Sequence, residues 1–227
     1  NHIEPIFCMN KNTSDIRKDY IFNEKNELNV LNEFTISKDP LSQFTKWFET
    51  ALEDDPSEAN AMFLATSTKE GKPSLRTVLL KGYDAEGFLF FTNYESRKGK
   101  ELMENPYASL LFFWKSLERQ VRIEGSIEKV SKEISETYFH SRPFESQLAA
   151  LSSDQSSVIP DRKCLEDKFN SLREKFNGNA IPLPENWGGF RLVPERIEFW
   201  QGRQNRLHDR ILYSLRNGEW KIERLAP

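Results

Sequence analysis

The chain has 227 residues, of which 37% are hydrophobic, 30% charged and 12% aromatic. This composition is typical of a globular protein, and the length is enough to bury a substantial core. The formal net charge of -3 gives no general attraction to nucleic acid or to an anionic membrane. Any site for an anion must therefore be local, and we expect neither a nucleic acid nor a membrane as partner.

Targeting and metal-binding signals are missing from the sequence. No apolar run is long enough to span a bilayer, and the N-terminal residues lack the layout of a signal peptide. We expect a cytoplasmic protein, although the sequence does not begin with Met and an upstream segment can be missing from it. Cys8 and Cys164 stand without CxxC spacing, and His2, His140 and His208 are scattered. We therefore predict no metal site and no disulfide scaffold.

The pattern of apolar residues predicts an N-terminal arm at 1–39 and one domain at 40–227. Asp39-Pro40 opens an amphipathic helix, which Asp54-Asp55-Pro56 closes. The period then changes to two, and the predicted strands cover 61–68, 74–81, 87–92, 108–114, 119–130, 189–193, 196–201, 206–215 and 219–224. Further helices are predicted at 96–104, 131–140 and 162–176. Short strands at this spacing suggest an antiparallel barrel, so the fold is predicted to be mainly β with peripheral helices (α+β).

A basic cluster lies at the start of the helix predicted at 96–104. Ser96 is a plausible N-cap, and Arg97, Lys98 and Lys100 follow it. Basic residues in a first turn oppose the helix macrodipole, unless an anion is bound at the free N–H groups of the helix end. We therefore favour a phosphate site here; the alternative is that these side chains extend into solvent.

Three further segments carry groups that can bind anions. Arg76 and Lys81 lie at the two ends of one predicted strand and on opposite faces, so they serve different ligands or terminate a buried strand. Residues 155–157 are Gln-Ser-Ser, which alone is ordinary turn chemistry.

The third of these segments combines a phenol, a guanidinium and a hydroxyl. Tyr138, Arg142 and Ser146 are spaced i, i+4, i+8, although Pro143 makes it doubtful that one helix carries all three. All three groups can donate to a phosphate. The alternative is packing by Tyr138 and a helix-dipole role for Arg142.

Near the C-terminus, residues 200–210 carry another cluster of basic groups. Arg206, His208 and Arg210 alternate with other residues, so on a strand they share one face. Two guanidiniums and an imidazole favour an anionic partner, such as a carboxylate or a phosphate ester. The alternative is a solvated edge strand whose charges prevent aggregation.

Several enzyme classes are excluded by absent motifs. The sequence has no P-loop, GxGxxG, GxSxG or HExxH, which argues against a nucleotide kinase, a Rossmann dehydrogenase, a serine hydrolase and a zinc protease. Several anion sites without a nucleophile suggest binding of phosphorylated small molecules, one of which carries the chemistry itself.

Taken in order, these segments resemble the pyridoxamine 5′-phosphate oxidase family. The matching stretches are RTVLLK at 76–81, FFTNYESRK at 90–98, ERQV at 118–121, YFHSRP at 138–143, QSS at 155–157, WGGF at 187–190, EFWQG at 198–202, RLHDR at 206–210 and the terminal ERLAP. The resemblance covers nearly the whole chain from Ile16, and its motifs agree in order and spacing. It implies a split β-barrel homodimer with FMN bound where the two chains meet.

The resemblance also assigns site residues. The positions that match FMN ligands are Arg76, Thr77, Val78, Leu79, Phe91, Thr92, Arg97, Lys98, Gln120, Gln155, Ser156, Trp200 and Arg210. The positions that match substrate-binding residues are Arg17, Lys18, Asp19, Tyr20, Lys81, Tyr138, Arg142, Ser146, Arg206, Leu207 and His208. Of these, Arg206 and His208 are the implied catalytic residues. Two departures are small: Thr77 stands where Met is frequent, and Arg203 adds a charge to a variable turn.

The implied reaction belongs to vitamin B6 metabolism. Pyridoxamine 5′-phosphate or pyridoxine 5′-phosphate is oxidised at C4′ to pyridoxal 5′-phosphate, with O₂ as acceptor and H₂O₂ as product. One alternative is a flavin oxidase of the same fold for another substrate, such as a phenazine precursor; the complete set of substrate-phosphate residues argues against it. The other is a non-catalytic carrier of FMN or pyridoxal phosphate, against which the intact Arg206 and His208 argue.

Overall fold

The computed structural model describes Tyr20 and residues 31–227. The predicted substrate residues Arg17, Lys18 and Asp19 lie outside the described residues, and so does most of the predicted arm. The strands are β1 (Ala61–Ser67), β2 (Pro73–Leu79), β3 (Gly82–Asp84), β4 (Gly87–Asn93), β5 (Tyr107–Trp114), β6 (Arg119–Lys129), β7 (Trp187–Gln201), β8 (Asp209–Arg216) and β9 (Glu219–Arg224). The α-helices are α2 (Pro40–Asp54), α3 (Arg97–Glu104), α4 (Lys132–Ser141), α5 (Phe144–Ser152) and α6 (Arg162–Phe176).

The strands form one antiparallel sheet that curls into a split barrel. Their order is β2-β1-β5-β6-β7-β4-β3, and β8 and β9 extend from β7 as a hairpin. Because β2 and β3 are the end strands of this order, the barrel is open between them, as a split barrel requires. The predicted fold class is confirmed.

The first described helix closes one side of the barrel. Asp39 caps it by accepting a hydrogen bond of 2.8 Å from the Ser42 N–H, and Pro40 occupies the first turn, where its missing N–H costs nothing. Phe44 and Trp47 are buried on its inner face. Phe44 is the centre of an aromatic cluster in which its ring contacts those of Phe48, Tyr83, Phe88, Phe112 and Trp114.

Two predicted strands prove to be one. The structure joins 189–193 and 196–201 into the continuous strand β7, which pairs with β6 across a register shift between Glu124 and Gly125. Pro194 lies opposite Gly125 at this irregularity, where the ladder does not need its missing N–H. The proline therefore bends the strand without ending it.

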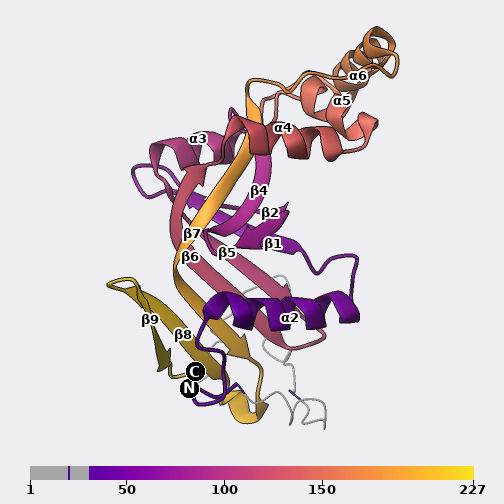
Figure 1. Ribbon diagram of the computed structural model, residues 1–227. Helices are drawn as coiled ribbons and strands as arrows, with labels where there is room; N and C mark the ends of the chain where they lie inside the picture. The colour runs from indigo at the N-terminus through magenta and orange to yellow at the C-terminus, as the bar shows by residue number, and fades with distance from the viewer. Residues whose placement is uncertain (1–19, 21–30) are drawn as a thin grey trace, which may run out of the picture.

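Pro143 divides the segment that carries the predicted phosphate donors. α4 ends at Ser141 with Arg142 as its C-cap, and α5 begins directly after Pro143. Ser146 therefore lies on α5, and the two helices meet at an angle that the sequence spacing did not define (Figure 1).

The prediction that 206–215 is one strand is wrong at its start. Gln204–Arg206 forms a short 3-10 turn, and β8 begins only at Asp209. Asn205 and Arg206 have positive φ values of 55° and 60°, which no strand accommodates. Arg206 and His208 therefore precede the strand, and the shared strand face predicted for them with Arg210 does not exist.

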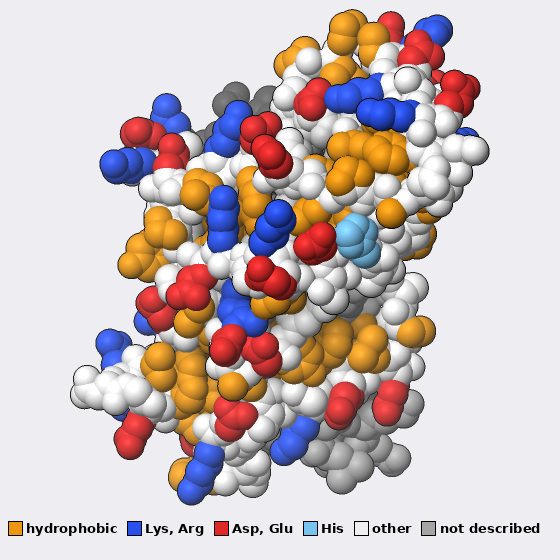
Figure 2. Space-filling model, turned by 45° about the horizontal axis from the view of Figure 1, so that its top comes forward, with side chains coloured by type: hydrophobic (Ala, Val, Ile, Leu, Met, Phe, Trp, Pro, Cys, Tyr) orange, Lys and Arg blue, Asp and Glu red, His pale blue; other side chains and the backbone are white. Residues whose placement is uncertain are grey.

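The helices α4, α5 and α6 and the C-terminal hairpin lie at opposite ends of the molecule (Figure 1). Figure 1 shows α4, α5 and α6 beyond one end of β7, and β8 and β9 at its other end. On the face seen in Figure 2, acidic and basic side chains are interspersed and no broad basic patch is visible. None of the helices in the described part of the chain is long and apolar enough to cross a membrane.

We expect Phe44→Ala to lower the free energy of unfolding by about 3–5 kcal/mol, because it opens a cavity in the aromatic cluster. Phe34→Ala is the matched control, since the Phe34 side chain is 89% exposed and its removal leaves no cavity. Chemical denaturation monitored by tryptophan fluorescence measures both. Equal losses for the two variants would show that the cluster does not hold α2 on the barrel.

Candidate functional site

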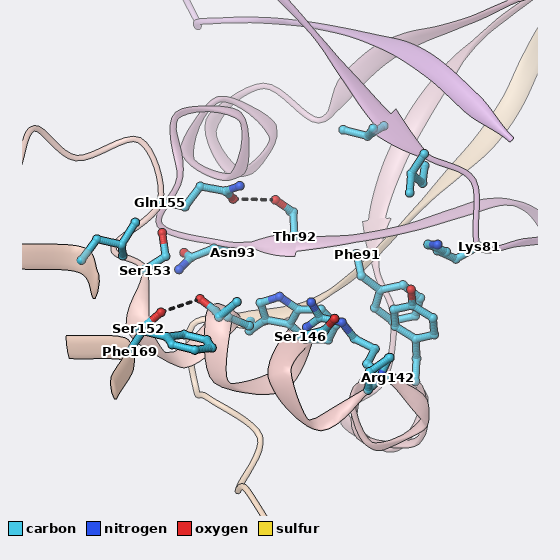
Figure 3. Close-up of a pocket in the computed structure, with 18 of the residues that line it drawn as sticks. Lys81, Phe91, Thr92, Asn93, Arg142, Ser146, Ser152, Ser153, Gln155 and Phe169 are labelled. Carbon is cyan, nitrogen blue, oxygen red and sulfur yellow. Dashed lines mark hydrogen bonds between the residues drawn. The ribbon is translucent and has the colours of Figure 1, made fainter. Parts of the chain in front are cut away.

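A cavity of about 990 Å³ lies between the barrel and the three helices α4, α5 and α6. Figure 3 shows Arg142 and Ser146 on the helical side, with Lys81 and Phe91 facing them from the barrel side. Eleven sequence-predicted residues line this cavity: Thr77, Val78, Leu79, Lys81, Phe91, Thr92, Lys98, Tyr138, Arg142, Ser146 and Gln155. The fold thus brings together segments that are far apart in the sequence.

Lys98 is a buried cation at one end of the cavity. Its side chain belongs to α3, whose N-cap Ser96 accepts the Gly99 N–H as predicted. The Lys98 ammonium donates to Thr92 Oγ1 at 3.0 Å and to Gln155 Oε1 at 3.1 Å. Burial, followed by the nearby Arg76 charge, lowers the pKa of Lys98 to about 8. Since no carboxylate of the described chain forms an ion pair with it, the ammonium lacks a counter-ion that an anionic ligand would supply.

Arg142 supplies a second incompletely paired cation. Its Nη1 atom is buried and has no hydrogen-bond acceptor within the described part of the chain. The guanidinium lies 5.0 Å from the centre of the Trp187 ring, a cation–π distance, and burial lowers its pKa. A planar fork of donors held in this way fits a phosphate.

The groups around Arg142 add to the same anion site. The N-cap of α5, Pro143, provides no side-chain cap, although the Ser146 N–H in the first turn already donates to the Pro143 carbonyl at 2.9 Å. Ser146 lies in the first turn of α5, and the Lys81 ammonium lies 6.0 Å from the centre of the Tyr138 ring. Lys81, Tyr138, Arg142 and Ser146 therefore lie around one part of the cavity, as predicted.

Flat aromatic rings form the wall between the two cationic regions. The Phe91 and Tyr138 rings stack at 4.0 Å between centres, and the Phe91 and Trp187 rings are nearly parallel at 5.6 Å. Such a wall can hold the ring system of a ligand in one plane.

Beside the cavity, one carboxylate organises two of the predicted cofactor residues. Glu101 is buried and accepts hydrogen bonds from Thr66, Ser74, Arg97 and, at 3.2 Å, Arg76. Burial alone would raise its pKa, but these hydrogen bonds, led by that from Ser74, lower the pKa of Glu101 to about 2. The carboxylate therefore stays ionised and fixes both guanidiniums.

A smaller hollow of about 390 Å³ adjoins this cluster. It is lined by Arg97, Lys100, Gln155 and Ser156, among others. Gln155 lines both this hollow and the main cavity, and Ser156 adopts a positive φ of 72° in the tight turn that follows it. Arg97, Lys98, Gln155 and Ser156 are therefore neighbours around the start of α3.

The remaining predicted residues gather at the other end of β7. Gln120 and Arg210 pair in register with Trp200, and the Trp200 ring lies 4.7 Å from that of His208. The Tyr20 ring lies 5.0 Å from His208 in an edge contact. Arg206 and Leu207 belong to the turn before His208.

This second group is remote from the cavity in the same chain. β7 carries Trp187 at the cavity and Trp200 in the second group, and thirteen strand residues span on the order of 40 Å. Arg210 does not face the cavity: its Nε donates to Glu198 at 2.7 Å and its Nη1 to the Ala226 carbonyl at 2.8 Å. The carboxylate partner predicted for this basic cluster is thus, for Arg210, a neighbouring residue of the sheet.

Two residues at the cavity were not predicted from the sequence. Glu101 is the buried counter-ion of Arg76 and Arg97, and its i, i+4 spacing from Arg97 was the available signal. Trp187 supports Arg142, and its presence in the WGGF stretch gave no indication of that contact.

Comparison with known proteins agrees with this arrangement. Residues 48–176 match the family model described as pyridoxamine 5′-phosphate oxidase, and residues 187–227 match that of the pyridoxine 5′-phosphate oxidase C-terminal dimerisation region. The pyridoxine/pyridoxamine 5′-phosphate oxidase of Trichormus variabilis is 51% identical over 96% of this chain and 100% of its own length. The chloroplastic enzyme 1 of Arabidopsis thaliana is 54% identical over 86% of this chain and 38% of its own length.

A solved structure adds a likeness in three dimensions. PhzG from Burkholderia lata, determined in complex with tetrahydrophenazine-1-carboxylic acid, superposes with a TM-score of 0.83 at 30% identity, over 88% of this chain and 98% of that one. The open barrel and its cationic cavity thus define a protein of the split-barrel class. Within this class, the chain belongs to the pyridoxamine 5′-phosphate oxidase family, whose members are generally flavin-binding.

We expect Glu101→Gln to lower the free energy of unfolding at pH 7 by about 1–3 kcal/mol, because hydrogen bonds to a charged acceptor are weakened. The folded-state pKa lies below the ordinary value of 4.5, so this stabilisation is present above pH 4.5 and is lost as pH falls toward 2. The difference from the parent protein should therefore shrink over that range in denaturation curves. Glu136→Gln, at an exposed position on α4, is the control with a change within about 0.5 kcal/mol. A difference that is constant with pH would contradict the role given to Glu101.

Proposed function

We propose that this protein is an FMN-dependent oxidase that converts pyridoxamine 5′-phosphate and pyridoxine 5′-phosphate to pyridoxal 5′-phosphate. The observation that carries the proposal is a pair of cations, the buried Lys98 and the half-buried Arg142, that line one cavity without a carboxylate of the described chain bonded to either. Two phosphorylated ligands, a cofactor and a substrate, would supply the two missing anions.

The donor set near Lys98 fits the phosphate of a mononucleotide. Arg76, Arg97 and Lys98 carry three positive charges and Glu101 one negative charge, which leaves a net charge of +2 for a phosphate dianion. Gln155 and Ser156 would add uncharged donors. Thr77, Val78, Leu79, Phe91 and Thr92 would then lie along the flavin ring and its chain.

The donor set near Arg142 fits the phosphate of the substrate. Lys81, Tyr138, Arg142 and Ser146 would hold this phosphate and thereby fix the orientation of the pyridine ring in the cavity. The buried, unpaired Nη1 of Arg142 would gain its acceptor in the complex. A substrate without a phosphate would leave that group unsatisfied, so the site would discriminate against it.

The overall reaction removes two electrons from C4′ of the substrate. FMN, when bound, supplies the two-electron acceptor, which O₂ restores with release of H₂O₂. With the amine substrate, water is consumed and ammonia is released as the aldehyde forms. Arg206 and His208 would lie over the pyridine ring, where they stabilise charge and hold protons on the ring substituents.

These two residues would come from a second copy of the chain. Arg206 and His208 lie at the other end of β7 from the cavity, on the order of 40 Å along the strand. The family model for a dimerisation region covers 187–227, which includes both residues together with Trp200 and Arg210. A homodimer would thus place Gln120, Trp200, Arg206, His208 and Arg210 of one chain beside the cavity of the other.

The direct test is the visible spectrum of the purified protein. We expect a yellow protein with one FMN per chain, whose flavin absorbance bleaches when pyridoxamine 5′-phosphate is added without O₂ and returns on aeration with formation of H₂O₂. Flavin that is bound but never bleached would favour a carrier, and bleaching only by a phosphate-free substrate would favour another oxidase.

We expect the affinity for FMN to fall as pH rises above about 8. Lys98 must be protonated to pair with the phosphate, and its pKa in the free protein is about 8, so binding above this pH must also take up a proton. Lys98→Met should weaken binding about 10- to 100-fold at pH 7 and remove this alkaline limb. Fluorescence titration of FMN measures both effects, with the exposed Lys221→Met as control. An unchanged alkaline limb in Lys98→Met would exclude Lys98 as its cause.

We expect Arg142→Ala to lower kcat/KM for pyridoxine 5′-phosphate about 10- to 100-fold while the dissociation constant of FMN stays unchanged, because only the substrate phosphate loses a partner. Arg142→Lys should recover little, since an ammonium does not reproduce the planar fork. Steady-state kinetics compare both with Arg162→Ala, whose side chain is 88% exposed on α6. Loss of FMN from Arg142→Ala would mean that the two phosphate sites have been assigned in reverse.

A further inference from the structure

The turn between β7 and β8 is held in a strained conformation. Asn205 and Arg206 are consecutive non-glycine residues with φ values of 55° and 60°, in the left-handed region. Such residues persist where the surrounding structure over-determines them, and they are frequent at functional sites. The contacts that hold this turn therefore decide where Arg206 and His208 lie.

An ion pair closes the turn at its two ends. The Arg203 Nε lies 2.7 Å from Asp209 Oδ2, and both side chains are largely buried. Asp209 is fixed in turn by Arg224 of β9, whose Nη1 lies 2.8 Å from Asp209 Oδ1. Arg224 also pairs with Glu33 at 2.7 Å. The residue that starts the turn is thus tied to the first residue of β8 and, through it, to the C-terminal strand.

The same turn fixes the protonation of the His208 ring. The Arg203 backbone N–H donates to His208 Nδ1 at 3.1 Å. A backbone N–H can only donate, so Nδ1 must be the unprotonated nitrogen and the neutral ring carries its proton on Nε2. Protonation of Nδ1 would place its N–H opposite the Arg203 N–H, and two donors cannot form this hydrogen bond.

The surroundings of His208 favour the same neutral form. The Tyr20 and Trp200 rings pack against it, and Arg206 adds a positive charge beside it, while Asp209 and Glu118 are the nearby carboxylates. Burial first, and then Arg206, lower the pKa of His208 against the opposite effect of the two carboxylates. His208 can therefore offer a hydrogen-bond donor at Nε2 near neutral pH.

We propose that Arg203 is a positioning residue: its ion pair with Asp209 clasps the turn so that His208 is held as the neutral Nε2–H tautomer beside Arg206. The catalytic part of this inference rests on the proposed function. In that reaction, the ion pair would make His208 donate its Nε2–H to an electron-rich atom of the substrate, rather than accept a proton as a base. Leu207 contributes its own N–H to the turn, at 3.1 Å from the Gln204 carbonyl, but its exposed side chain takes no part in the clasp.

Nitrogen-15 NMR of the histidine side chains tests the clasp directly. The chain has three histidines, so His208 is assigned by comparison with His208→Gln. In the FMN-loaded parent protein we expect the pattern of an unprotonated Nδ1 and a protonated Nε2. Alanine keeps the backbone N–H of residue 203 but removes the ion pair with Asp209 that holds it against His208 Nδ1. In Arg203→Ala we therefore expect a mixture of tautomers and a titration midpoint higher by about half to one pH unit, because the loosened turn no longer opposes protonation of the ring. Arg203→Lys, which keeps the charge, should restore most of the parent behaviour.

Two controls separate the clasp from a general loss of structure. Arg216→Ala removes an exposed arginine from the far end of β8 and should leave the His208 signals unchanged. Retention of FMN and an unchanged melting temperature in Arg203→Ala would show that the fold is intact. Should that variant fail to fold, Arg203→Lys and Arg203→Gln, which keep the length of the side chain, take its place as a charged and uncharged pair.

The clasp is overturned if the parent protein shows a protonated Nδ1, or if Arg203→Ala and Arg203→Gln leave both tautomer and titration unchanged. The acid limb of kcat/KM should move in the same direction as the NMR titration in these variants. Because the NMR signature needs no turnover, a protein that keeps it but lacks oxidase activity supports the clasp and refutes only the proposed reaction.

Discussion

The length of β7 is the constraint on which the account of this protein depends. One continuous strand of 15 residues carries Trp187 at the helical cavity and Trp200 beside His208. A strand cannot fold back on itself, so these two groups stay far apart in one chain. The cavity provides cations and a flat aromatic wall, and the remote end provides Arg206 and His208. Under the proposed function, a complete site therefore requires two chains.

The pairing of charges differs between the two ends of β7. At the cavity, Lys98 is buried, Arg142 is half-buried with a buried Nη1 atom, and neither has a carboxylate partner within the described chain. In the proposed function, phosphorylated ligands supply these partners. Arg210, by contrast, is already paired with Glu198. Its predicted contact with FMN would have to use the guanidinium N–H groups that Glu198 does not occupy. Glu101 has a related role beside the cavity. It neutralises one of the three positive charges there and holds the guanidiniums of Arg76 and Arg97 in place. The buried carboxylates Glu101 and Glu198 thus hold arginine side chains in place on β2, α3 and β8.

Much of the fold could be predicted because its signals are local. The α2 helix and most strands follow from caps, from periods of 3.6 or two, and from turn residues, and the structure confirms them. The errors have two causes: Pro194 depends on a partner distant in the sequence, whereas the turn at 204–206 depends on a local ion pair that the alternation of residues does not show. Gly125 opposite Pro194 lets β7 continue, and the Arg203–Asp209 ion pair stabilises backbone angles that alternation cannot reveal.

For the candidate site, the residue types could be predicted from the sequence, but their arrangement in space could not. Tyr138, Arg142 and Ser146 were identified by residue type, but their convergence depends on the break at Pro143, which lies between two helices. Glu101 escaped notice because a glutamate within a basic helix looks like an ordinary surface residue until its burial is known. Neither residue type nor spacing could indicate which of the predicted site residues lie together at the cavity and which lie at the other end of β7.

Complementation between two impaired variants tests this central claim most directly. Arg142→Ala alters the cavity and Arg206→Ala the remote end; the two proteins are dissociated, mixed in equal amounts and reassembled. In a mixed dimer, one site then receives an intact Arg142 from one chain and an intact Arg206 from the other. The account predicts recovery of about a quarter of the parent activity, because half of the dimers are mixed and each has one intact site. No recovery above the separate variants, with mixed dimers verified by mass spectrometry, would contradict a site shared between chains.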